Sequence, residues 1–152
     1  SVGQAIEALM AVSPTRARVA TSAGPLDGLR LARTCYDHFA GRLGVSVTDA
    51  MVRRRILTPA GRDFVLTASG ARWLGRLGVD VEKTRGERRA FARQCLDWSE
   101  RRAHLAGALG AAVARRCLDL RWMQFVGEQR TLALTPQGRR GLRKWFGIRW
   151  KP

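Results

Sequence analysis

Leu31-Ala32-Arg33-Thr34-Cys35-Tyr36-Asp37 is the stretch that decides the fold, because it recurs as Phe91-Ala92-Arg93-Gln94-Cys95-Leu96-Asp97. The residues that follow it recur as well: His38-Phe39-Ala40-Gly41-Arg42-Leu43-Gly44 matches His104-Leu105-Ala106-Gly107-Ala108-Leu109-Gly110. Internal similarity in a kept order is typical of a duplicated structural unit. We therefore predict that the chain contains the same unit twice.

A third block extends the match toward the carboxyl end of each copy. Phe64-Val65-Leu66-Thr67-Ala68-Ser69-Gly70 matches Leu132-Ala133-Leu134-Thr135-Pro136-Gln137-Gly138, and the main insertion in the second copy falls at residues 98–103. The predicted organisation is an N-terminal helix and linker, a first repeat and a second repeat, over residues 1–28, 29–80 and 81–152.

The first copy has the pattern of helices joined by a hairpin. Apolar residues at four-residue spacing predict a helix over 31–39, glycines predict a turn at 41–44, and a second helix is expected over 45–57. Turn residues at 59–63 predict a short hairpin. A threonine then begins a helix over 67–78, which ends at a glycine.

The second copy predicts the same order of elements. A helix is expected over 91–103, another from about 105 or 111 to 123, a hairpin turn at Gly127 and a last helix from Thr135-Pro136. Residues 3–12 and 80–89 are also predicted to be helical. The predicted fold is mainly α (α+β): two tandem winged-helix-like repeats, each made of helices and a short β-hairpin, with an N-terminal helix.

The composition favours a folded, strongly basic protein. A hydrophobic fraction of 45% is too high for a disordered chain, and no apolar stretch is long enough to cross a membrane. Three cysteines do not form a disulfide framework and fit a reducing cytoplasm. Lysine and arginine number 28 against 12 acidic residues, for a net charge of +16. Such a charge attracts polyanions, of which DNA is the first candidate.

The candidate DNA contacts are basic residues near the ends of predicted helices and at a hairpin tip. They are Arg53, Arg54, Arg55, Arg62, Arg115, Arg116, Arg121, Arg139, Arg140, Arg143 and Lys144. These residues either contact nucleic acid directly or are simply solvated, as arginine on helix faces often is. Only the three-dimensional arrangement shows whether these basic side chains form one continuous surface or are spread over the protein.

The matched blocks resemble a known family. Cys-Tyr-Asp-His-Phe-Ala-Gly-Arg-Leu-Gly, followed by Cys-Leu-Asp-Trp-Ser-Glu-Arg-Arg-Ala-His-Leu-Ala-Gly-Ala-Leu-Gly, is similar to the carboxy-terminal region of a subgroup of ArsR-type helix-turn-helix regulators. The resemblance implies a dimeric repressor whose amino-terminal winged helix reads the operator. We expect that reader to lie outside this sequence. The paired-cysteine metal motif of metal-sensing relatives does not occur here.

Two aligned cysteine and histidine pairs form the most site-like feature. If the copies pack about a pseudo-twofold axis, Cys35, His38, Cys95 and His104 would converge with ligand chemistry suited to Zn²⁺. Buried cysteines with histidines that hydrogen-bond are the simpler interpretation, because no closely spaced Cys-x-x-Cys supports a metal. The sequence therefore predicts a hydrogen-bonded repeat interface with no metal and no other cofactor.

Further residues are expected at the same interface. Asp37 and Asp97 are candidates to pair with Arg33, Arg93 or backbone amides, and Trp98 lies within the insertion of the second copy. No nucleophile, phosphate-binding loop or His-Glu-x-x-His motif accompanies the aspartates, so the sequence predicts no enzyme.

The expected function is regulation of transcription. This part of the protein would sense an effector or form a dimer, with DNA, a small-molecule effector and a second copy as partners and with no membrane. The alternative is a free-standing nucleic-acid-binding module built from tandem winged helices. A basic face that spans both copies would favour the alternative, whereas a closed apolar pocket would favour the regulator.

Overall fold

A computed structural model describes residues 5–6, 9, 25–127 and 130–151. It mixes helices with small antiparallel sheets, which is consistent with an α+β fold. The elements of residues 29–80, called the first segment, are α2 (Pro25–Leu31), β1 (Arg33–Cys35), β2 (His38–Ala40), α3 (Gly41–Arg53), β3 (Leu57–Ala60), β4 (Asp63–Leu66) and α4 (Ala68–Leu77), with α2 starting just before it.

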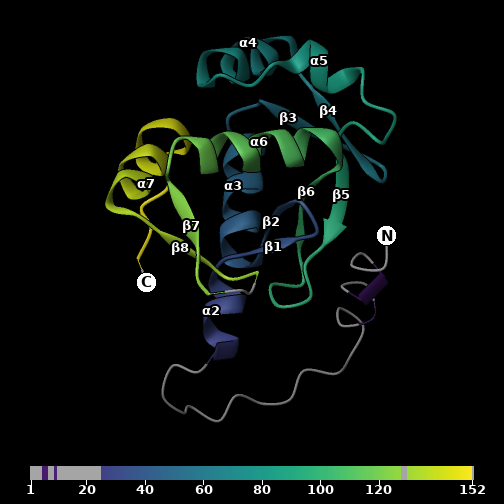
Figure 1. The fold of residues 1–152 in the computed structure, drawn as a ribbon. Coiled ribbons are helices and arrows are strands. Elements are labelled where there is room, and N and C mark those ends of the chain that lie inside the picture. The colour runs from purple at the N-terminus through teal and green to yellow at the C-terminus, as the bar shows by residue number, and fades with distance from the viewer. Residues whose placement is uncertain (1–4, 7–8, 10–24, 128–129, 152) are drawn as a thin grey trace.

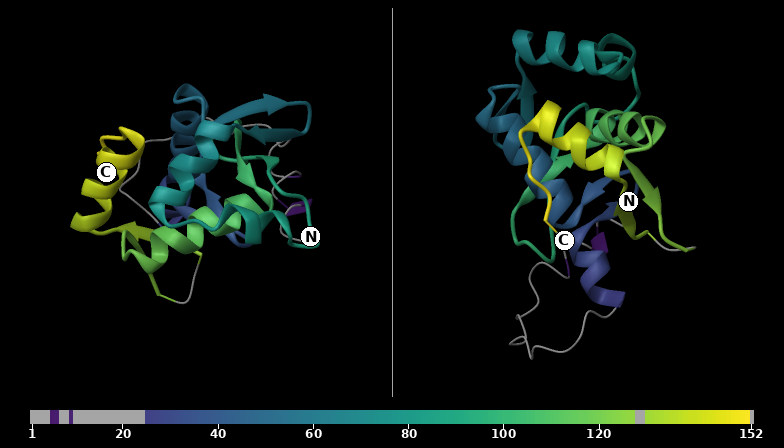
Figure 2. Two further views of the ribbon diagram at one scale, coloured as in Figure 1. Left: turned by 90° about the horizontal axis from the view of Figure 1, so that it is seen from above. Right: turned by 90° about the vertical axis from the view of Figure 1, so that its left-hand side faces the viewer.

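The elements of residues 81–152, called the second segment, follow a similar order. They are α5 (Val81–Arg85), β5 (Arg93–Leu96), β6 (Ala103–Ala106), α6 (Gly107–Asp119), β7 (Met123–Phe125), β8 (Leu132–Leu134), α7 (Pro136–Gly141) and the π-helix η1 (Leu142–Phe146). Figure 1 places α4 and α5 at one end of the molecule and α2 at the other, and the right-hand view of Figure 2 shows the same arrangement from the side.

The hairpins of the two segments pair with one another. Hairpin β3–β4 of the first segment joins hairpin β5–β6 of the second through Asp63 and Arg93, which makes a four-stranded antiparallel sheet. A second link joins the segments elsewhere: Arg33 of β1, in the first segment, forms an antiparallel bridge with Thr131, which directly precedes β8 of the second segment. Each segment therefore extends a hairpin of the other, so the segments interlock.

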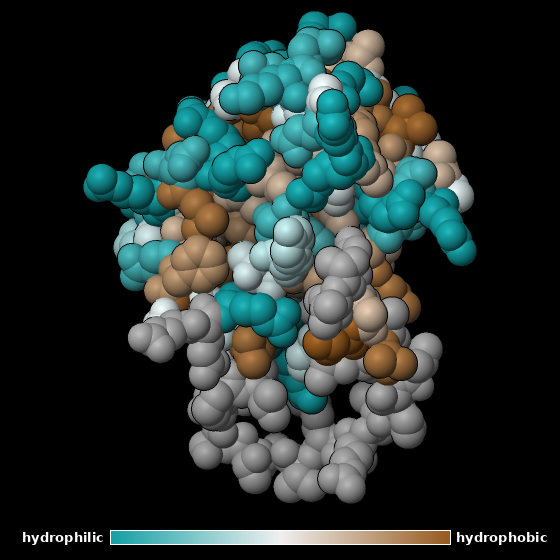
Figure 3. All heavy atoms as spheres, turned by 45° about the vertical axis from the view of Figure 1, so that its right-hand side comes forward, coloured by the Kyte–Doolittle hydropathy of each residue, from teal (hydrophilic) through white to brown (hydrophobic). Residues whose placement is uncertain are grey.

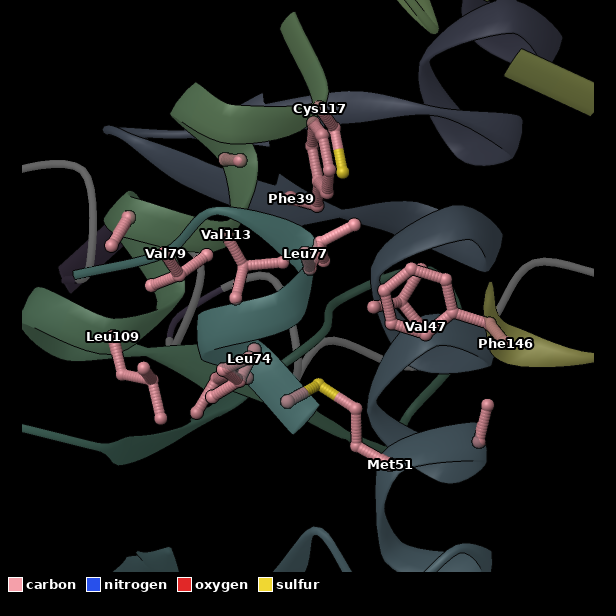
Figure 4. Packing of buried hydrophobic residues seen from close by; sticks show 14 of the residues in the cluster. Phe39, Val47, Met51, Leu74, Leu77, Val79, Leu109, Val113, Cys117 and Phe146 are labelled. Carbon is pink, nitrogen blue, oxygen red and sulfur yellow. The ribbon is translucent and has the colours of Figure 1, made fainter. Parts of the chain in front are cut away.

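One hydrophobic core is shared by both segments. Met51 and Leu74 of the first segment belong to the same buried cluster as Leu109 and Val113 of the second, and Figure 4 shows these side chains facing a common interior. Burial of apolar surface is the main source of stability in such a domain. The core therefore holds α3, α4 and α6 in place around the hairpins.

Two threonines begin helices in the same way. The hydroxyl of Thr67 accepts a hydrogen bond from the Gly70 amide at 2.9 Å, and the hydroxyl of Thr135 accepts one from the Gly138 amide at 2.9 Å. Each cap satisfies an amide that the first turn of a helix leaves without a partner. The predicted N-caps of α4 and α7 are confirmed, as is the end of α4 at Gly78, which has a φ of 93°.

The predicted helices over 31–39 and 91–103 are wrong. Residues 33–40 form hairpin β1–β2, and residues 93–106 form hairpin β5–β6. The apolar residues at this spacing in the first copy lie in three elements, Leu31 in α2, Cys35 in β1 and Phe39 in β2, so the spacing did not mark the face of one helix. Tyr36 has a φ of 59°, and this left-handed residue turns the chain between β1 and β2.

Other predicted boundaries differ from the structure. The expected turn at 41–44 is the first turn of α3, which runs from Gly41 to Arg53 and ends before the predicted limit at residue 57. The helix predicted from 105 or 111 to 123 is α6, Gly107–Asp119, and the one predicted over 80–89 is the shorter α5.

The hairpins predicted near 59–63 and Gly127 are present as β3–β4 and β7–β8. Most of the predicted helix over 3–12 lies outside the described residues. Among the described helices, none combines the length and the apolar character that crossing a membrane requires.

Candidate functional site

The two cysteine and histidine pairs are placed by equivalent hairpins. Cys35 lies directly across hairpin β1–β2 from His38, and Cys95 lies directly across hairpin β5–β6 from His104. Cross-strand partners of an antiparallel pair bring their Cβ atoms to about 5 Å. Each hairpin therefore presents one thiol and one imidazole together, although Cys35 and His38 were expected on one helix.

The two pairs meet in the interior of the protein. The side-chain donor atoms of Cys35, His38, Cys95 and His104 all lie within 4.8 Å of one another, and all four residues are buried. Nε2 of His38 lies 3.1 Å from Nε2 of His104. Small buried residues surround the thiols, because Ala40 and Ala106 cluster with the two cysteines. The structure thus brings together four residues that the sequence distributes over two hairpins.

The helices that follow the hairpins close the site reciprocally. A Cβ at Gly44 of α3 would lie 3.5 Å from the Cβ of His104, and a Cβ at Gly110 of α6 would lie 3.2 Å from the Cβ of His38. Each helix therefore packs against the histidine of the other segment. These close approaches fix the imidazole rings because packed interiors leave little free volume.

A carboxylate lies on the outer side of each imidazole. Nδ1 of His38 is 3.4 Å from Oδ1 of Asp37, and Nδ1 of His104 is 3.1 Å from Oδ2 of Asp97. The distance between His104 and Asp97 suits an ion pair, but Nδ1 of His104 does not meet the geometry of a hydrogen bond to this carboxylate. Both rings consequently direct Nε2 inward and Nδ1 toward an acidic side chain.

The surroundings change the proton affinities of these groups. Hydrogen bonding with Cys95 and burial raise the pKa of the Cys35 thiol to about 12. Burial alone would lower the pKa of His104, but the Asp97 carboxylate and Cys35 raise it above its usual value. Burial alone would raise the pKa of Asp37, but contacts with His38 and Arg89 lower it to about 2.

Asp97 is the centre of a buried polar network. It accepts hydrogen bonds from Arg33 at 3.0 Å, from the Gly41 amide at 2.7 Å and from the amide and hydroxyl of Ser99 at 2.9 and 2.7 Å. Burial alone would raise the pKa of Asp97, but His104, Arg33 and these donors hold it well below its usual range. Arg33 and Asp97 belong to different segments, so the network joins them.

The insertion at 98–103 makes the two segments unequal. Trp98 lies beneath the guanidinium of Arg33, at 4.8 Å from ring centroid to Cζ, which is a cation–π distance. Asp37 is 31% exposed and pairs with Arg89 at 2.6 Å, whereas Asp97 is fully buried. Sequence reasoning did not single out Ser99 or Arg89, whose roles depend on contacts between segments.

The candidate DNA contacts come from several elements, and three of them, Arg116, Arg140 and Lys144, line one pocket. Arg53, Arg54 and Arg55 are exposed at the end of α3, and Arg62 is exposed at the tip of β3–β4. Arg115 and Arg121 are exposed near the end of α6; Arg139, Arg140, Arg143 and Lys144 are exposed on α7 and η1. On the face shown in Figure 3, hydrophilic side chains form groups with hydrophobic residues between them.

Arg116 differs from the other candidates because it is half-buried. Its Nε donates a hydrogen bond of 2.7 Å to the carbonyl oxygen of Leu77, at the end of α4. A cation at this position also interacts favourably with the carboxyl end of a helix. Arg116 therefore has a structural contact inside the protein, whatever else it binds.

A pocket of about 490 Å³ lies between α4, α6, α7 and η1. Its lining includes four cationic side chains, from Arg76, Arg116, Arg140 and Lys144, together with the rings of two tryptophans, Trp122 and Trp145. Sequence reasoning did not identify this pocket, because its lining comes from four elements that no single motif connects.

The comparisons with known proteins give one strong relationship. The chain is 40% identical over 121 residues, which is 80% of its length, to the uncharacterized HTH-type transcriptional regulator YdfF of Bacillus subtilis (strain 168). The match covers 54% of that protein, so the chain spans about half the length of this relative. No family model matches the sequence, and no solved structure matches it.

Proposed function

We propose that this chain is the effector-sensing or dimerisation part of an ArsR-type transcriptional regulator whose DNA reader lies elsewhere in the full-length protein. The observation that carries the proposal is the 40% identity to an HTH-type transcriptional regulator over most of this chain. Because the chain corresponds to only 54% of that relative, the relative has room for a further domain of ordinary size. DNA is therefore a partner of the whole protein, and no enzymatic role is proposed.

The proposed architecture is a pair of interlocked winged-helix-like units. Arg55 and Arg121 have φ values of 55° and 56° and precede hairpins β3–β4 and β7–β8, which lead to the caps Thr67 and Thr135. Helix, hairpin and capped helix in this order are typical of the second half of a winged helix. These matched local features support a duplication, and the interlocking of hairpins explains why the two units form one body.

The proposed effector site is the pocket between α4, α6, α7 and η1. Arg76, Arg116, Arg140 and Lys144 give it a positive field, whereas Trp122 and Trp145 give it apolar and aromatic walls. Pockets with largely apolar walls and a few placed polar groups are typical of small-molecule sites. The ligand class that fits is a small organic anion with an aromatic or aliphatic body.

Selection of DNA by the full-length protein and by this chain tests the proposal. Each protein is used to select from a pool of random-sequence duplexes, and the bound DNA is sequenced. We expect the full-length protein to enrich one operator-like sequence and this chain to enrich none. Failure of the full-length protein to enrich any sequence would contradict the proposed regulator.

The free-standing nucleic-acid-binding module remains the second candidate. The net charge of +16 favours it, because such a charge binds phosphate backbones without a separate reader. The same selection distinguishes the two functions: enrichment of one sequence by this chain alone would show that its own elements read DNA.

A further inference from the structure

We propose that Cys35, His38, Cys95 and His104 bind a single Zn²⁺ ion that ties hairpin β1–β2 to hairpin β5–β6. The proposal goes beyond the regulatory function and does not depend on it. It also differs from the metal-free interface that the sequence favoured, because the structure shows how closely the four donor atoms converge.

The donor set matches the chemistry of zinc. Two thiolate sulfurs and two imidazole nitrogens are the ligands of many tetrahedral zinc sites. With metal–ligand bonds of about 2.0 to 2.3 Å, the edges of such a tetrahedron measure about 3.3 to 3.8 Å. The four donor atoms here lie within 4.8 Å of one another, and the two Nε2 atoms are 3.1 Å apart. Shifts of about 1 Å or less therefore suffice to surround an ion.

Each imidazole ring has a carboxylate near Nδ1, as many metal-binding histidines do. Metal-binding histidines usually direct the second ring nitrogen toward a carboxylate or carbonyl, which holds the ring and raises its basicity. Asp37 lies 3.4 Å from Nδ1 of His38, and Asp97 lies 3.1 Å from Nδ1 of His104. The two Nε2 atoms face one another at 3.1 Å, and an ion between the four donors would replace that mutual contact. In a neutral hydrogen-bonded pair of histidines the donor ring carries its proton on Nε2 and has none on Nδ1 to share with a carboxylate, whereas an ion bound to both Nε2 atoms leaves a proton on each Nδ1.

The backbone supports the same conclusion. Each hairpin contributes a cysteine and the histidine directly opposite it, so the ligands are delivered by two short rigid elements rather than by loops. Gly44 and Gly110 allow α3 and α6 to approach the histidines of the opposite hairpins. The convergence of Cys35 with Cys95 thus follows from the packing of the two segments.

Burial and charge indicate a structural ion rather than a catalytic one. All four residues are buried, and four protein ligands complete a tetrahedron without leaving a position for water or substrate. Two thiolates balance the two positive charges of the ion, which avoids a net charge in the interior. Binding of Zn²⁺ releases the thiol protons to solvent, and no oxidant or reductant takes part.

The first test measures the metal content of the chain purified without chelator and supplied with Zn²⁺ before desalting. We expect one zinc per chain by inductively coupled plasma mass spectrometry. The double variant Cys35→Ala, Cys95→Ala is expected to lose that zinc. Cys117→Ala is the matched control, because Cys117 is equally buried but lies in the main core, outside the four-residue cluster.

A second measurement keeps the proposal testable if the double variant fails to fold. Co²⁺ replaces Zn²⁺ in the wild-type chain, and its visible and near-ultraviolet absorption reports tetrahedral geometry and bonds to thiolate. Both signals are expected, and equimolar Zn²⁺ should abolish them. Folded wild-type chain that retains no stoichiometric zinc and gives no thiolate–cobalt band would overturn the proposal. Zinc that persists in a folded double variant would overturn it as well.

Discussion

The guanidinium of Arg33 lies 3.0 Å from the carboxylate of Asp97, and neither side chain is exposed to solvent. Arg33 belongs to β1 of the first segment, whereas Asp97 directly follows β5 of the second. Asp97 also accepts a hydrogen bond from the backbone amide of Gly41, at the start of α3. This one carboxylate therefore connects a strand, a helix and the insertion that carries Trp98.

Replacing Asp97 is expected to destabilise the protein strongly. Asp97→Asn removes the negative charge but keeps the shape of the side chain, so Arg33 is left as a buried cation without its counter-charge. We expect a loss of about 3 to 5 kcal/mol in the free energy of unfolding, measured by urea denaturation. Asp63→Asn is the control, because Asp63 pairs with Arg93 in an exposed position and should cost less than about 1 kcal/mol. Equal losses in the two variants would contradict this account.

Gly44 and Gly110, near the starts of α3 and α6, should respond to alanine substitution in the opposite direction from Gly75, which lies near the end of α4. A Cβ at Gly110 would lie 2.5 Å from the Leu105 carbonyl oxygen, and one at Gly44 would clash with the Phe39 carbonyl oxygen. Both alanine variants should lose about 1 to 3 kcal/mol because the backbone must shift. Gly75, within α4, has open space at this position, so Gly75→Ala should gain about 0.5 to 1 kcal/mol. Chemical denaturation of the three variants side by side tests the prediction, which fails if Gly75→Ala is the least stable.

The helix caps Thr67 and Thr135 are expected to contribute equally to the stability of the protein. Besides accepting an amide, each threonine hydroxyl donates a hydrogen bond of 2.7 Å, from Thr67 to the Arg55 carbonyl and from Thr135 to the Arg121 carbonyl. Alanine at either position should cost about 1 kcal/mol, seen as a lower midpoint of thermal unfolding. Thr58→Ala on exposed strand β3 serves as the comparison and should change stability by less than about 0.5 kcal/mol. A large difference between the two cap variants would show that their settings are not equivalent.

Chelation of the proposed zinc should lower thermal stability. An ion that binds only the folded state contributes about 2.7 kcal/mol when its concentration is one hundred times the dissociation constant. For a domain of this size that corresponds to a rise in Tm of roughly 5 to 10 °C. Differential scanning calorimetry of Zn²⁺-loaded and chelator-treated protein measures the difference. The same treatment of the Cys35→Ala, Cys95→Ala variant should leave its Tm unchanged, and a shift there would place the ion elsewhere.

DNA binding by this chain alone should be weak, salt-sensitive and indifferent to sequence. The net charge of +16 draws the chain to phosphate, and phosphate contacts carry little sequence information. Titration of two unrelated duplexes at two salt concentrations should give equal affinities that fall steeply with salt. Charge removal at Arg53, Arg54 and Arg55 should weaken both complexes alike. A preference for one duplex that survives high salt would instead indicate direct base recognition.

The sequence by itself determined the local features of this protein. Thr67 and Thr135 were predicted as N-caps, and Gly78 as the end of α4, because caps and left-handed helix ends depend on a few neighbouring residues. The matched blocks also singled out Cys35, His38, Cys95 and His104. The periodicity predicted a helix where the structure has hairpin β1–β2, because strands of three residues are too short to show an alternating apolar pattern of their own.

Only the tertiary structure decided how these residues meet. His38 and His104 converge because each segment extends a hairpin of the other and each helix packs on the opposite histidine. Such pairing between distant strands depends on the shared burial of the core, which no local pattern encodes. The pairing of Arg33 with Asp97 depends equally on the insertion that covers it. Local chemistry therefore named the residues of the site, and long-range packing brought their donor atoms within 4.8 Å of one another.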